Sequence, residues 1–179
     1  VFMITASPIE FKVIDSDELA RIQNLHFEKA FANRIAMTHH DLSNEDKALI
    51  SERRKQHQPW SLIVGAYSGS EAIGWHVGYA TDPETYYMKN SAVVAEYRNQ
   101  GVYSKMLDFV LDEIKRAGFQ VATSIHHGNN PSVLIPKLKK GFVISGTQFH
   151  EKFRFLVELK LFFSEERKKA YGKSMGLEL

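Results

Sequence analysis

The fold of this chain is decided by the stretch Ser91-Ala-Val-Val-Ala-Glu-Tyr-Arg-Asn-Gln-Gly-Val-Tyr-Ser-Lys-Met-Leu107. An apolar, strand-like run ends in a short polar turn that contains Gly101, and a helical pattern begins immediately after it. Apolar residues recur from Val102 to Ile114 at the three- and four-residue spacing of a helix with one buried side. The stretch therefore predicts a strand, a tight turn and an amphipathic helix in succession.

A turn of this kind can bind an anion. The first N–H groups of a helix have no partner within the helix, and the helix dipole places partial positive charge at the same end. A strand–turn–helix unit that contains a glycine can therefore hold a phosphate group, which indicates a nucleotide-like ligand. Such turns are also common as purely structural connections, so the motif needs a second signal.

Composition narrows the classes of function. The chain has 179 residues, a formal net charge of +2 and no cysteine. The charge is too small to indicate a nucleic-acid partner, and the lack of cysteine excludes disulfides, thiolate nucleophiles and thiolate metal sites. No apolar run is long enough to span a membrane, and the histidine pairs lack the spacing of metal ligands. We expect one domain over residues 1–179 in a cytoplasmic protein without a metal; the sequence leaves a homodimer open.

The remaining segments show either the apolar spacing of a helix or that of a strand. Helices are expected from Asp15 to about Ala36, from Ser43 to near Gln58, and over 102–117, 131–140 and 164–171. Strands are expected over 10–14, 61–67, 71–81, 85–94, 121–126, 142–146 and 153–163. The order predicts an α/β protein of the α+β type, in which a mixed sheet is flanked by helices.

Two motifs together resemble those of the GNAT superfamily of N-acetyltransferases, which bind acetyl-coenzyme A. The first is Arg98-Asn-Gln-Gly101-Val-Tyr103, and the second is Asn130 at the head of a helix followed by Gly141-Phe142. The resemblance covers roughly residues 9–163. It implies a mostly antiparallel, seven-stranded sheet that is splayed between its fourth and fifth strands.

The resemblance also implies a set of cofactor contacts. Backbone N–H groups would hold the coenzyme A pyrophosphate, and the backbone before them would pair with the pantetheine arm like an added strand. Asn130 would contact the cofactor or act as an ordinary helix cap, and both can hold. The implied cofactor-binding residues are Val93, Val94, Ala95, Arg98, Asn99, Gln100, Gly101, Val102, Tyr103, Ser104 and Asn130. The N–H near Val94 would polarise the thioester carbonyl.

Two positions depart from the family pattern. Tyr103 stands where Gly or Ala is usual, and we expect its ring to point into the core. Lys137, preceded by Pro136, stands where many members carry a tyrosine that donates a proton to the departing thiolate. We expect Lys137 to be a solvated surface lysine, which could replace the tyrosine only if its ammonium reaches the sulfur.

The general base is not identified by the pattern. Residues 85–94 contain no carboxylate, and we expect Glu96 to face solvent beside Arg98. His76 titrates nearest to neutral pH but is expected to be a satisfied strand histidine. Glu96, His76 and Lys137 are thus the weak catalytic candidates. An acceptor pocket could be lined by Tyr86, Tyr87 and the His39-His40 loop.

Three hypotheses of function follow. The first is an N-acetyltransferase that moves an acetyl group from acetyl-coenzyme A to a primary amine by direct attack. The second is a coenzyme A-binding sensor or scaffold without turnover, which the missing tyrosine and unplaced base favour. The third is an interaction domain that binds no anion.

Overall fold

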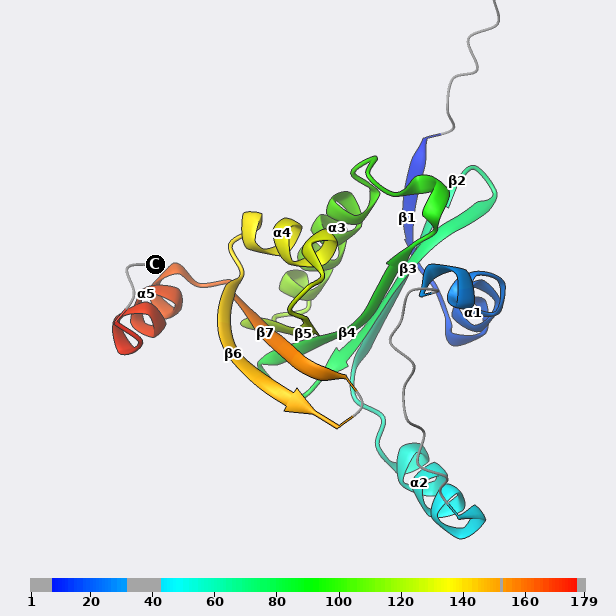
Figure 1. The fold of residues 1–179 in the computed structure, drawn as a ribbon, viewed down its shortest axis with the longest axis horizontal. Helices are drawn as coiled ribbons and strands as arrows, with labels where there is room; N and C mark the ends of the chain where they lie inside the picture. The colour runs from blue at the N-terminus through cyan, green and yellow to red at the C-terminus, as the bar shows by residue number, and fades with distance from the viewer. Residues whose placement is uncertain (1–7, 32–42, 152, 177–179) are drawn as a thin grey trace, which may run out of the picture.

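The computed structural model describes residues 8–31, 43–151 and 153–176, and Figure 1 shows its arrangement. Seven strands and five α-helices occur in the expected order, with one short 3₁₀ helix before α3. The elements are β1 (Ile9–Val13), α1 (Ser16–Ala30), α2 (Asn44–Gln56), β2 (Ser61–Ser68), β3 (Glu71–Ala80), β4 (Thr85–Val93), η1 (Ala95–Tyr97), α3 (Val102–Arg116), β5 (Val121–His127), α4 (Pro131–Lys139), β6 (Val143–His150), β7 (Arg154–Phe162) and α5 (Glu165–Ser174). Within the described ranges, no helix combines the length and the apolar composition that crossing a membrane requires.

All seven strands form one sheet in the order β1-β2-β3-β4-β5-β7-β6. Every neighbouring pair is antiparallel except β4 and β5, which run parallel. The β4–β5 pairing extends only from Thr85↔Val121 to Tyr87↔Thr123, and beyond it the strands part. The predicted mixed, mostly antiparallel sheet with a splay between the fourth and fifth strands is confirmed.

Helices cover both faces of the sheet. Figure 1 shows α3 and α4 on one face and α1 on the other. The predicted apolar side of α3 is confirmed, because Val102, Met106, Val110 and Ile114 are all buried. On the opposite face, Ile22 of α1 is fully buried in a cluster with Trp75. Each such side chain contributes about 1.5–3 kcal/mol when fully buried, so these two layers position the elements around the splay.

Two predicted boundaries differ most from the structure. Helix α1 ends at Ala30 rather than near Ala36, because its last turn is fixed by tertiary contacts. The Ala30 carbonyl accepts a hydrogen bond from the Arg98 guanidinium at 2.9 Å, and the Phe31 ring packs 6.2 Å from the Trp75 ring. Strand β6 continues to His150 instead of ending at Gly146, because it follows β7 along its whole length through a bulge.

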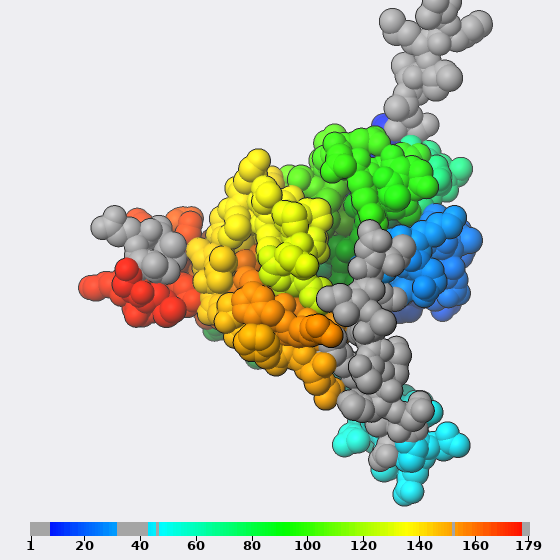
Figure 2. Space-filling view, in the orientation of Figure 1, coloured from blue at the N-terminus to red at the C-terminus, as the bar shows by residue number. Residues whose placement is uncertain are grey.

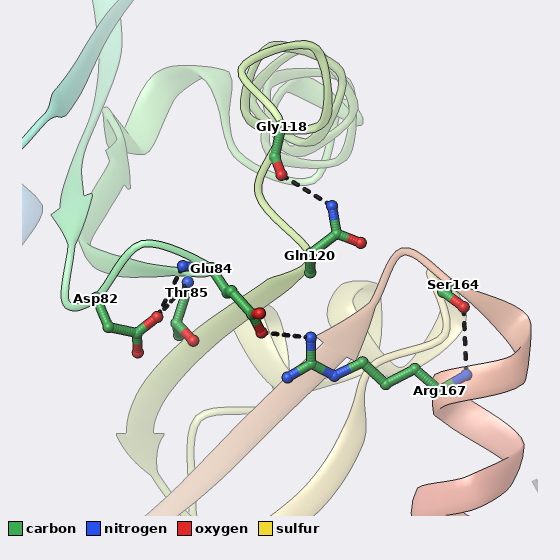
Figure 3. Close-up of polar contacts among 7 residues, drawn as sticks. All are labelled: Asp82, Glu84, Thr85, Gly118, Gln120, Ser164 and Arg167. Carbon is green, nitrogen blue, oxygen red and sulfur yellow. Dashed lines mark hydrogen bonds and ion pairs between the residues drawn. The ribbon is translucent and has the colours of Figure 1, made fainter.

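The end of the splay where the strands meet is held by polar contacts, which Figure 3 shows. The Asp82 carboxylate accepts the N–H groups of Glu84 and Thr85, both at 2.8 Å. The Glu84 carbonyl accepts the N–H of Gln120 at 2.9 Å, and the Glu84 carboxylate binds Arg167 of α5 at 2.8 Å. The strands are therefore fixed at one end and separate at the other.

Candidate active site

The turn between β4 and α3, residues Asn99 to Ser104, carries unpaired backbone donors. Gly101 has φ of 77° and Asn99 has φ of 59°, so two residues of this β4–α3 turn are left-handed. Glycine adopts that conformation freely, and asparagine does so more readily than most residues. Among the described residues, no backbone or side-chain acceptor meets any N–H group from Asn99 to Ser104. These donors therefore remain available to a ligand.

The surroundings of this turn suit an anion. A side chain built on Gly101 would meet nothing within 4 Å, so the space above the turn is open. The first turn of α3 contains no acidic residue, and its dipole contributes positive charge at the same point. In Figure 2 the segment before α3, in green, and α4, in yellow, lie on the same face of the molecule.

Polar side chains of the turn brace it instead of pointing outward. Arg98 donates from Nε to the Val93 carbonyl and from a terminal nitrogen to the Ala30 carbonyl, both at 2.9 Å. Gln100 donates from Nε2 to the Glu96 carbonyl at 2.8 Å. The structure therefore places Arg98 and Gln100 at the site as supports for the backbone, while Ser104 lies half-buried in the first turn of α3.

The edge of β4 before the turn shows which N–H near Val94 is free. The Val94 N–H itself donates to the Ile73 carbonyl at 2.9 Å and is already paired. Successive strand residues point their backbone groups to opposite sides. Val93 therefore presents its N–H and carbonyl to the splay, where Arg98 reaches that carbonyl. Ala95 begins the 3₁₀ helix η1 and is exposed.

Asn130 stands at the start of α4, followed by Pro131 in the first helical turn as predicted. Its side chain does not cap the helix backbone; Oδ1 instead accepts the Ser132 hydroxyl at 2.7 Å. Asn130 is therefore the N-cap of α4 by position, as expected, but its side chain makes no capping hydrogen bond. Asn130 is half-buried, and the far end of α4 is joined to α3 by an ion pair between Lys140 and Asp108.

Tyr103 behaves as expected, and Lys137 does not. Tyr103, in the first turn of α3, packs against the core, and burial raises the pKa of its hydroxyl. Lys137 is 1% exposed, so the prediction of a solvated lysine was wrong. Its Nζ lies 3.3 Å from Met88 Sδ, and burial lowers its pKa to about 7. A helical signal existed in the sequence, because Lys137 follows the core residue Leu134 by three positions and shares its face.

The other titratable candidates are not equivalent. His76 is 1% exposed and both ring nitrogens are bonded, Nδ1 to Ser91 Oγ at 2.8 Å and Nε2 to Tyr86 Oη at 2.9 Å. Burial, followed by the charge of Lys137, lowers its pKa to about 3, which confirms a satisfied strand histidine. Glu96 is exposed, also as predicted.

The proposed acceptor pocket is not assembled as expected. Tyr86 is fully buried in the core, where it binds His76, so it does not line a pocket. Tyr87 is half-buried, with its ring 5.6 Å from that of Tyr79. The His39-His40 loop lies outside the described residues.

Sequence reasoning missed two polar atoms on β5. Ser124 Oγ and His126 Nε2 are buried and have no hydrogen-bond partner within the described part of the chain. They lie two residues apart on one strand and thus on the same face. Burial, followed by the positive charge of Lys137, lowers the pKa of His126 to about 3. We call Ser124, His126 and Lys137 the buried cluster.

A separate hollow of about 650 Å³ lies between the sheet and α5. It is lined by residues that include Thr81, Asp82, Thr85, Thr123, Arg167 and Tyr171, at the fixed end of the splay. None of the residues predicted to bind the cofactor lines it. The hollow is therefore distinct from the β4–α3 turn.

Comparisons with known proteins agree with this geometry. The ribosomal-protein-S18-alanine N-acetyltransferase from Escherichia coli shares the fold with 12% identity and a TM-score of 0.65, over 88% of this chain and 95% of that chain. An N-acetyltransferase from Staphylococcus aureus does so with 17% identity and a TM-score of 0.64, over 88% of this chain and 100% of that chain. A GNAT family acetyltransferase from Elizabethkingia anophelis with acetyl-CoA bound does so with 17% identity and a TM-score of 0.58, over 87% of this chain and 98% of that chain. No curated protein matches the sequence. The family model described as "Acetyltransferase (GNAT) family" matches residues 20–135, so the chain belongs to that family.

Proposed function

We propose that this protein transfers an acetyl group from acetyl-coenzyme A to a primary amine. The observation that carries the proposal is the set of unpaired N–H groups from Asn99 to Ser104 beneath open space. A diphosphate is the part of coenzyme A that such donors bind best. Acetyl-CoA bound to the Elizabethkingia anophelis protein of the same fold supports the choice of donor.

The remaining contacts follow from the splayed strands. The pantetheine arm would lie along the free edge of β4 at Val93, Val94 and Ala95, and Asn130 would contact it from α4. The Val93 N–H replaces the paired Val94 N–H as the donor to the thioester carbonyl, where negative charge develops during attack. The acceptor amine attacks this carbonyl directly, so that positioning supplies much of the rate enhancement.

Thermal unfolding with two ligands tests this proposal. Acetyl-coenzyme A at 100 times its Kd should add about 2.7 kcal/mol to the unfolding free energy. For a chain of this size, that corresponds to a Tm increase of roughly 5 to 10 °C. S-acetylpantetheine lacks the diphosphate and should give little increase at the same concentration. Equal effects of the two ligands, or no effect of either, would refute the assigned phosphate site.

Turnover separates an enzyme from a sensor. A coenzyme A-binding domain without turnover is favoured by the lack of any carboxylate in β4 and by a lysine at position 137. Thiol release from acetyl-coenzyme A should be measured with spermidine, L-lysine, kanamycin and an alanyl peptide. The chain has no cysteine, so a thiol-reactive dye reports the coenzyme alone. Binding without release with any of these amines would favour the sensor.

A further inference from the structure

Lys137 is buried without a counter-ion. Its Nζ contacts Met88 Sδ at 3.3 Å and lies 5.0 Å from the centre of the Phe142 ring. None of the described carboxylates forms an ion pair with it. Because an isolated ammonium is costly to bury, the side chain can lose its proton far more readily than an ordinary lysine. Burial accordingly lowers its pKa to about 7.

The position of Lys137 coincides with the opening of the sheet. Tyr87 of β4 and Thr123 of β5 form the last pair between these strands. Lys137 contacts the next residue of β4, Met88, and the next residue of β5 is Ser124, whose Oγ has no described partner. The register of β3 and β4 also shifts here, which gives β4 an extra residue. The buried cluster therefore lies where the two strands separate.

The unpaired atoms of the cluster indicate that a ligand is expected there. Buried polar side-chain atoms nearly always have a hydrogen-bond partner, and a buried atom without one lowers stability. Ser124 is fully buried, and the His126 Nε2 atom, two residues further along β5, is also excluded from solvent. An acyl thioester that entered between β4 and β5 would supply oxygen and sulfur atoms at this point.

We propose that Lys137 is the catalytic proton carrier of the transfer reaction, an inference that rests on the function proposed above. Its neutral amine takes a proton from the attacking nitrogen as the new N–C bond forms. The C–S bond then breaks, and the departing thiolate takes that proton from the Lys137 ammonium. The products are an amide and the coenzyme A thiol, and Lys137 returns to its neutral form. One side chain thus performs the work of both base and acid.

The neighbouring titratable groups are less suited than Lys137 to carry the proton. The Lys137 charge acts on the pKa of His76 on β3 and of His126 on β5, and His76 Nε2 is hydrogen-bonded to Tyr86 Oη. The pKa of each imidazole is lowered to about 3, chiefly by burial, so both are neutral at pH 7. From α3, Tyr103 lines the same small hollow as His76 and Met88, and burial raises its pKa.

The first test compares Lys137→Met with Lys139→Met, an exposed lysine on the same helix. With the amine that the wild type acetylates fastest, Lys137→Met should lower kcat by roughly 100- to 10,000-fold. The Tm increase caused by acetyl-coenzyme A should stay the same in both variants. In the wild type, kcat/KM should increase with pH through an apparent pKa near 7, and Lys137→Met should lack this increase. Unchanged kcat in Lys137→Met, or a wild-type kcat/KM that decreases with pH near pH 7, would overturn the proposal.

The second test needs no acceptor. A lysine ammonium beside sulfur lowers a thiol pKa. The ultraviolet absorbance of the thiolate should therefore show a lower thiol pKa for coenzyme A bound to the wild type or to Lys139→Met than to Lys137→Met. Equal titration in all three would overturn the role of Lys137 even if coenzyme A binds. Absence of coenzyme A binding to the wild type would instead remove the proposed function itself.

Discussion

The β4–α3 turn and the buried cluster both contain polar groups without partners, but their physical situations are opposite. In the turn the groups are backbone N–H donors beneath open space, where water can bind them until a ligand arrives. In the cluster they are side-chain atoms that are excluded from water. The first arrangement therefore costs little stability, whereas the second lowers it. The comparison is consistent with the roles proposed above, binding of the diphosphate at the turn and proton transfer at the cluster.

The largest expected effect concerns the cost of burying Lys137. Its pKa in the folded protein is about 7, below the ordinary value of 10.5. The unfolded chain therefore binds more protons between these values, so wild-type stability rises with pH across this window. The penalty is complete below about pH 7. Lys137→Met should therefore increase the unfolding free energy by about 2 to 4 kcal/mol at pH 6, and the gain should vanish near pH 10.

Denaturant unfolding of the wild type and of Lys137→Met from pH 6 to pH 10 measures this difference. Lys139→Met, with an exposed side chain, should show no such pH-dependent gain. A Lys137→Met variant that is less stable than the wild type at pH 6 would mean that the lysine stabilises the fold, and the contrast between the two regions would fail.

A pair of glycines tests the turn. Gly101 and Gly118 flank α3, both have positive φ, and a side chain at either would meet no atom within 4 Å. Valine at each position should therefore cost a similar 1 to 3 kcal/mol of backbone strain. Only Gly101→Val should weaken acetyl-coenzyme A binding, by roughly 100-fold or about 2.7 kcal/mol, because its side chain enters the phosphate space. Calorimetric Kd values that change equally in both variants would contradict this assignment.

Two serines give the smallest effect and the most direct comparison of paired and unpaired groups. Ser91 Oγ bonds to His76 Nδ1 at 2.8 Å, whereas Ser124 Oγ has no described partner. Ser91→Ala should lower the unfolding free energy by about 1 kcal/mol, because it leaves a buried ring nitrogen unpaired. Ser124→Ala should instead raise it, by up to about 1 kcal/mol. Thermal unfolding without ligand measures both, and a loss in Ser124→Ala would show that its hydroxyl is satisfied.

The features that could be predicted from the sequence are those with local causes. The apolar spacing from Val102 to Ile114 identified α3, and Gly101 marked the left-handed turn, because each depends on neighbouring residues. The splay was also predicted, through the two motifs that resemble those of the GNAT superfamily. Helix α1 ends where Arg98, which is distant in sequence, binds the Ala30 carbonyl. No local pattern contains such a contact.

The features of the candidate site can be divided in the same way, into those with local causes and those that depend on contacts distant in sequence. The free N–H groups follow from the turn itself, but the pairing of Val94 with Ile73 depends on how β3 lies beside the end of β4. The burial of Lys137 could not be predicted from its residue type, because lysine is nearly always exposed; only its three-residue spacing from the partly buried Leu134 points to the core. The unpaired atoms of Ser124 and His126 become visible only when the strands are placed in space.

The polar contacts at the start of β4 and β5 have a mechanical consequence. The Glu84 carbonyl accepts the N–H of Gln120 and so joins the two strands at one end, where Asp82 and Arg167 bind Glu84. Three residue pairs follow before the strands diverge. Strands β4 and β5 can therefore rotate about a hinge at their paired end, which lies far from their separated ends. A small rotation at this hinge changes the gap between the strands only slightly beside Tyr87 and most strongly where the coenzyme arm would enter. Such a motion would widen the entrance for ligand exchange and leave the paired end of the strands almost unchanged.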